Sequence, residues 1–135
     1  MKLIDANIVI YAMGEPHAYK LSCQRVFSLV YEGRLEANID TELLQEILHF
    51  YQRRNHLDFG LALFDRLVTL FPDPFPVSRE RVVLARDMLA RHRQVEARDA
   101  LHAAVVLQED LEGIISADRG FDSIAGLTRF DPMQL

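Results

Sequence analysis

The chain has one cysteine, Cys23, among its 135 residues. It can therefore form neither an internal disulfide nor a zinc site built from several cysteines. No apolar stretch approaches the ~20 residues that a membrane-spanning helix needs. Asp5 and Asn7 interrupt the apolar residues at the N-terminus, so we expect no signal peptide and a cytoplasmic location. The sequence also lacks a Walker glycine loop, a Gly-x-Ser-x-Gly motif and a His-Glu-x-x-His motif, the signatures of P-loop proteins, many serine hydrolases and zinc proteases.

Lysine is scarce as well, because Lys2 and Lys20 are the only two and the other basic residues are arginines. The chain carries 20 acidic and 15 basic residues, a net charge of −5. If four acids belonged to one site, the rest of the chain would be close to neutral, and two divalent cations would offset most of the excess. The acidic balance predicts no broad basic surface, although it leaves a nucleic-acid partner possible.

The length and the hydrophobic content of 50% indicate a single domain, residues 1–135, with a substantial core. Periodicity and turn signals predict strands that alternate with helices, an arrangement typical of an α/β fold with a parallel sheet between helices. The expected strands are 3–5, 35–39, 114–117 and 127–130, with a short extended piece at 72–76. The expected helices span about 23–32, 41–51, 57–71, 78–92 and 97–109.

Four acids interrupt or end apolar stretches instead of lying on polar surfaces. Asp5 and Asp118 each follow an expected strand, Glu46 interrupts an apolar helix stripe, and Asp99 begins a buried helix. Ligands bind at the carboxyl edge of an open α/β sheet. Each acid also has a plainer explanation, such as a turn, a helix cap or the favourable dipole of a helix start. Together they suggest a single carboxylate site.

Several carboxylates within a few ångströms cannot all ionise without a cation, because like charges raise one another's pKa. A site made of oxygen ligands without cysteine favours Mg²⁺ or Mn²⁺. Such a site suits phosphodiester hydrolysis, since a bound metal activates water and stabilises the leaving oxygen.

Two other constellations have to be weighed. Glu46-x-x-His49 and Asp99-x-x-His102 match the spacing of di-iron helical bundles, but the expected strands argue against a bundle. Asp5-Ala6-Asn7 faintly resembles the start of haloacid-dehalogenase-like phosphatases. That family has a second Asp where this chain has Asn7, and it needs a lysine in its site.

The same residues resemble the PIN domain family more closely. Its opening motif is similar to Leu3–Tyr11, its second acid to the segment ending at Glu46, and its third to Arg98–Ala104. Its closing motif is similar to Ser116–Asp122. Order and spacing agree along nearly the whole chain, and the short length resembles VapC-type toxins of toxin–antitoxin pairs. Ala6 departs from the family, many members of which carry Thr or Ser there.

The resemblance implies a PIN-like fold with a central parallel sheet of about four to five strands flanked by helices. It implies a Mg²⁺- or Mn²⁺-dependent endoribonuclease that cleaves RNA, a small antitoxin protein as partner, and a homodimer. The alternatives are a PIN-like module that binds RNA or protein without cleaving it and a dehalogenase-like phosphatase. The implied catalytic and metal-binding residues are Asp5, Glu46, Asp99 and Asp118, with Asp122 as an auxiliary acid at the metal and with Asn7 and Ser116 supporting them. Beside Asp99, Arg98 is the candidate for a phosphate contact.

Overall fold

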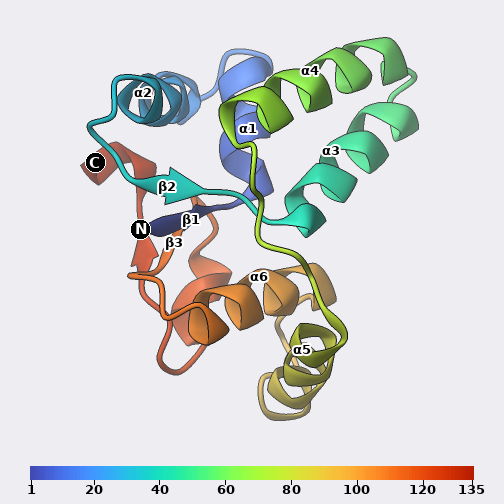
Figure 1. Ribbon diagram of the computed structural model, residues 1–135, viewed down its shortest axis with the longest axis vertical. Coiled ribbons are helices and arrows are strands. Elements are labelled where there is room, and N and C mark those ends of the chain that lie inside the picture. Colours follow the sequence, from blue (N-terminus) through green and yellow to red (C-terminus); the bar gives the residue numbers. More distant parts are fainter.

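A computed structural model describes all residues, 1–135 (Figure 1). The strands are β1 (Lys2–Ile4), β2 (Ala37–Asn38), β3 (Ile114–Ile115) and β4 (Arg129–Phe130). The helices are α1 (Ala6–Met13), α2 (Lys20–Tyr31), α3 (Thr41–Arg53), α4 (Leu57–Leu70), α5 (Arg79–Arg91) and α6 (Ala97–Gln108), with short 3₁₀ helices at Arg119–Ser123 and Pro132–Gln134. None of the helices has the length and apolar content that a bilayer crossing requires.

The strands form one parallel sheet in the order β2-β1-β3-β4. β1 is thus next to β3, so the predicted neighbours Asp5 and Asp118 follow adjacent strands. Parallel strands need crossover connections, and the helices that supply them cover both faces of the sheet. Figure 1 shows α1 to α4 on one side of the strands and α5 and α6 on the other. The predicted α/β class, with its central parallel sheet between helices, is confirmed.

The core is split by the sheet because successive side chains of a strand point to opposite faces. Leu3 and Ile114 pack with α5 and α6, whereas Ile4 and Ile115 pack with α1, α2, α3 and α4. All four side chains are fully buried. Short apolar strands with no polar alternation are what a sheet covered on both faces requires.

Two local expectations need correction. The expected helices did not include residues 6–13, but Ala6–Met13 is α1, and Asp5 occupies its N-cap position. The N-cap of α3 is Asp40, whose carboxylate accepts a hydrogen bond from the Leu43 N–H at 2.9 Å. The Thr41 hydroxyl accepts a hydrogen bond from the Val77 N–H. The extended piece at 72–76 contributes only the isolated bridge between Asp40 and Phe75.

Candidate active site

The register of β1 and β3 places the first two site residues side by side. Leu3 pairs with Ile114 and Ile4 with Ile115, so Asp5 and Ser116 are the next residues on the two strands. The Ser116 hydroxyl donates to Asp5 Oδ2 at 2.6 Å. It also accepts from Asn7 Nδ2 at 3.1 Å and from the Asp118 N–H at 2.9 Å. A hydroxyl has one proton and two acceptor positions, so all of its capacity is used and its proton must point at Asp5.

Asp118 lies directly after this network, at the start of the 3₁₀ helix Arg119–Ser123. Its Oδ1 accepts from the Gly120 N–H at 2.8 Å, which fixes the side chain at the edge of the cavity. Asp122, one 3₁₀ turn further on, is not brought to the cavity. Its carboxylate forms an ion pair with Arg129 at 2.9 Å. The structure therefore unites Asp5 and Asp118 and separates Asp122 from them.

Glu46 reaches the site from α3 through a histidine on α6. Glu46 Oε2 lies 2.9 Å from Nε2 of His102, and the same nitrogen lies 3.7 Å from Asp5 Oδ1. The other ring nitrogen, Nδ1, lies 2.7 Å from Oδ2 of Asp40. Both His102 and Asp40 are fully buried. The imidazole thus lies among three carboxylates: Asp40 at the start of α3, Glu46 within α3, and Asp5 after β1.

The burial and charges around His102 act in opposite directions on its pKa. Burial alone would lower it, but the carboxylates of Asp40, Glu46 and Asp5 raise the pKa of His102 well above its usual value. An imidazolium donates from both nitrogens, which matches the two short contacts. His102 is therefore an internal cation that partly neutralises the acidic cluster.

Asp99 lies one turn before His102 on α6, so both side chains lie on the same face of that helix. Burial, followed by the charge of Asp5, raises the pKa of Asp99 to about 7. Burial also raises the pKa of Asp5, despite the favourable charge of His102 and the Ser116 hydrogen bond. Both carboxyl groups therefore hold their protons more tightly than exposed aspartates do.

Arg98 lies beside these acids, but it is already paired. Its guanidinium is 3.4 Å from Glu46 Oε1 and 3.0 Å from Glu96 Oε2. The side chain is about half exposed. Arg98 thus lines the cavity, with Glu46 and Glu96 as its partners, and its contact with a phosphate stays a prediction.

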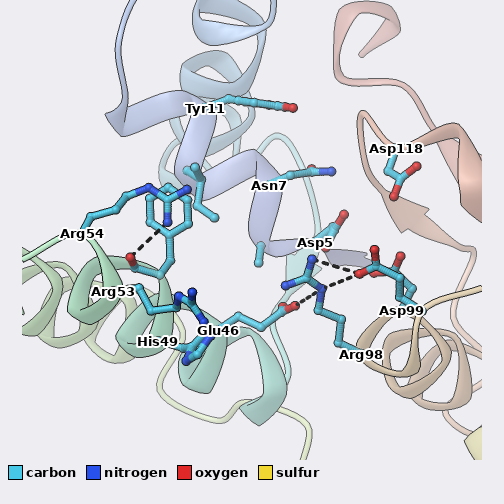
Figure 2. A pocket seen from close by; sticks show the side chains of 14 residues that line it. Asp5, Asn7, Tyr11, Glu46, His49, Arg53, Arg54, Arg98, Asp99 and Asp118 are labelled. Carbon is cyan, nitrogen blue, oxygen red and sulfur yellow. Dashed lines mark hydrogen bonds and ion pairs between the residues drawn. The ribbon is translucent and has the colours of Figure 1, made fainter.

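The four predicted acids line one cavity of about 500 Å³, together with Asn7 and Arg98 (Figure 2). Figure 2 shows Asp5, Glu46, Asp99 and Asp118 converging from four different elements. Sequence reasoning missed several other residues that line it, on α1 and α3: Tyr11, His49, Phe50, Arg53 and Arg54. A signal for the α3 residues was present, because they follow Glu46 at i+3, i+4, i+7 and i+8 and so share its helix face.

The donor set fits a hard divalent cation. Asp5, Glu46 and His102 offer ligand atoms within 4.8 Å of one another. Asp99 and Asp118, which line the same cavity, offer further oxygen ligands. Both nitrogens of His102, however, are engaged by carboxylates. We therefore assign the cation to the carboxylate oxygens, with His102 supporting them from behind, and oxygen ligands suit Mg²⁺ or Mn²⁺.

The structure disfavours the two other constellations. The central sheet excludes a di-iron helical bundle. A dehalogenase-like site needs a lysine among its acids, but neither lysine lines this cavity. Lys2 is paired with Glu112, and Lys20 donates to the Gly14 carbonyl.

The fold and the four converging acids define a small acid-cluster α/β domain. The chain belongs to the PIN domain family, whose model matches residues 2–127. It is 38% identical over 129 residues to Ribonuclease VapC13 of Mycobacterium tuberculosis, covering 96% of this chain and 98% of that protein. It is 32% identical over 109 residues to Ribonuclease VapC23 of the same species, covering 77% and 82%.

Solved structures support the fold. The crystal structure of M. tuberculosis VapC20, a sarcin-ricin loop cleaving toxin, matches with a TM-score of 0.77 and 19% identity, covering 95% of this chain and 97% of that one. The FitAcB structure from Neisseria gonorrhoeae matches over both full chains with a TM-score of 0.74 and 19% identity. At this identity the likeness extends to the fold alone.

Proposed function

We propose that this protein is a metal-dependent endoribonuclease and the toxin of a toxin–antitoxin pair. The observation that carries the proposal is the convergence of Asp5, Glu46, Asp99 and Asp118 on one cavity in a chain whose full-length relative is named a ribonuclease. A non-cleaving module would not need to keep four acids around one cavity against their mutual repulsion.

Asp5, Asp99 and Asp118 would hold Mg²⁺ or Mn²⁺, and Glu46 would bind it directly or through water. The metal, when bound, lowers the pKa of the attacking water and stabilises the departing oxygen. Ser116 prevents the Asp5 carboxylate from rotating, because its single proton is committed to Oδ2. The Asp40–His102 pair performs the same orienting task for Glu46.

The substrate is held at its phosphates by arginine. A guanidinium matches phosphate through two parallel N–H bonds. Arg98 is the residue next to the acids, and a phosphate that enters the cavity would replace Glu96 as its partner. Glu96 is the natural group to release, since it is well exposed, whereas Glu46 is nearly buried.

As a toxin acting on RNA in the cytoplasm, the protein would require restraint by a small antitoxin. A basic side chain of that partner would compete with the metal for the acids. We also propose a homodimer, which light scattering coupled to size exclusion would test.

Cleavage of a fluorescent single-stranded RNA in Mg²⁺ or Mn²⁺, compared with EDTA, tests the proposed activity. The wild-type chain should cut internally and only with metal, and Asp118→Asn should abolish the cut while the circular dichroism spectrum stays unchanged. Glu80→Gln, on the exposed side of α5, is the matched control and should retain full activity. An Asp118→Asn variant as active as Glu80→Gln would overturn the assignment.

A further inference from the structure

The acidic cavity adjoins a second cavity, which none of the four acids lines. The second cavity has a volume of about 660 Å³ and shares Ile10, Tyr11, Phe50 and Arg54 with the first. The two therefore adjoin, with α1 on one side and α3 on the other. From Glu46 to Arg54 α3 rises by roughly 12 Å at 1.5 Å per residue, so this groove extends well past the acids.

Two stacked pairs of side chains line the groove. On α3, the Arg54 guanidinium carbon lies 3.6 Å from the centre of the Phe50 ring, and Arg54 Nη1 donates to the Phe50 carbonyl at 3.3 Å. On the α1 side, the rings of Tyr11 and His17 stack with centroids 4.4 Å apart and planes 7° apart. Figure 2 shows Tyr11 and Arg54 lying well to one side of Asp99 and Asp118. Planar groups held flat in this way are the surfaces on which unpaired bases stack.

The charge of the groove is opposite to that of the acid cluster. Arg53 and Arg54 form no ion pair, in contrast to Arg98, which is paired with Glu46 and Glu96. The second cavity is lined by Lys20, His17 and His56 as well as Arg54, and Glu15 is its only acid. A chain of phosphates would thus meet cations immediately beyond the acids that hold the metal.

We propose that this groove is a nucleotide subsite, in which the base next to the scissile phosphate of a single-stranded RNA stacks between Arg54–Phe50 and Tyr11–His17. The inference rests on the proposed ribonuclease function and adds the residues that hold the base beside the scissile phosphate. An unpaired base fits because a base inside a duplex is already stacked on its neighbours and has no free face to present to the two walls. Arg53 lies on the same face of α3 and contacts the adjoining phosphate.

Arg54 permits a test that separates stacking from charge. Arg54→Ala removes both, whereas Arg54→Lys keeps the charge and loses the planar group. Both substitutions fall at an exposed helix end, so the fold is retained. Loss of the stacking interaction of one base corresponds to a rise in KM of roughly 5- to 150-fold. We expect this for Arg54→Ala with little change in kcat, because the residue does not touch the acids.

Direct stacking is measured with an RNA that carries 2-aminopurine beside the cleaved bond, bound to the full chain in an Asp5→Asn background that does not cut it. Arg54→Lys should lose the fluorescence quenching but keep the salt dependence of binding. Arg54→Ala should lose the quenching and also flatten the slope of log K against log salt by about 0.7. Tyr11→Leu should lose the quenching, and the conservative variant Tyr11→Phe should recover it because it keeps the aromatic ring. Arg66→Ala, exposed on α4 outside both cavities, is the matched control and should change neither quantity.

Two results would overturn the subsite while leaving the ribonuclease intact. One is a wild-type chain that cleaves RNA with a KM that Arg54→Ala and Tyr11→Leu do not change. The other is full quenching in Arg54→Lys, which would show that Arg54 contributes its charge and not a stacking surface. If the wild-type chain cleaves no RNA under any metal condition, the proposed function itself fails. If these variants instead lose a helical protein partner but keep their KM for RNA, the groove docks protein and the subsite is refuted.

Discussion

Nδ1 of His102 lies 2.7 Å from Oδ2 of Asp40, and neither residue is exposed to solvent. Through the opposite nitrogen the same ring holds Glu46 at 2.9 Å. Asp40 also caps α3, the helix that carries Glu46. One buried carboxylate therefore fixes both the start of that helix and the orientation of its functional acid.

We expect Asp40→Asn to destabilise the protein by about 3–5 kcal/mol, because it removes the nearest carboxylate from the buried imidazolium of His102. The loss should depend on pH. The pKa of His102 is raised well above 6.5 by its carboxylates, so their contribution to stability is complete below pH 6.5 and disappears as pH rises through the folded-state pKa. Urea unfolding of wild type and Asp40→Asn at pH 6 and pH 9 measures this. An equal loss at both pH values would show that the cap, not the charged pair, is what Asp40 provides.

The metal-free protein should become less stable as pH rises from about 4 to 7. Asp99 has a folded-state pKa of about 7 against an ordinary 3.8, so in this range the folded state binds the proton that the unfolded state has lost. Asp99→Asn removes that titration and should flatten the decline, while abolishing RNA cleavage. Melting temperatures in EDTA across the range are the measurement. If the melting temperature of the wild type rises with pH in parallel with that of Asp99→Asn, the raised pKa of Asp99 is contradicted.

Mn²⁺ or Mg²⁺ should raise the melting temperature most above pH 7, where Asp99 is ionised. A ligand that binds only the folded state at 100 times its Kd stabilises by about 2.7 kcal/mol. Asp5→Asn should reduce the rise because it removes a central ligand. Differential scanning fluorimetry with titrated metal provides the measurement, and Glu80→Gln provides the control. Absence of any divalent binding in calorimetry at millimolar metal would refute the metal site.

Expression of the chain alone should halt growth of its native host lacking the partner gene, and co-expression of the partner should restore growth. The Asp5→Asn variant should be harmless and should recover a small partner in pull-down. The physical reason is that an uninhibited ribonuclease degrades host RNA. Harmless expression of the wild-type chain, with no small partner recovered, would remove the toxin role and leave the nuclease activity to be judged by the cleavage assay.

Much of the fold followed from local signals. Strands that alternate with helices predicted a parallel sheet covered on both faces, and Leu3, Ile4, Ile114 and Ile115 are packed in this way. The sequence predicted Asp5 and Asp118 at the same edge of the sheet; in the structure Asp5 directly follows β1, Asp118 comes three residues after β3, and both line one cavity. The helix Ala6–Met13 was missed because its eight residues are too few and too uniformly apolar to show a helical period.

Sequence alone determined the identity and order of the four acids, because residues at strand and helix ends interrupt apolar runs in a way that the linear pattern records. Only the tertiary structure decided which neighbours they have. The ring of His102 meets Asp40 across 62 positions of sequence, and Asp122, although only four residues from Asp118, turns away to Arg129. Such pairings depend on strand register and helix orientation, which are set by packing of the whole core, so no local pattern of residues encodes them.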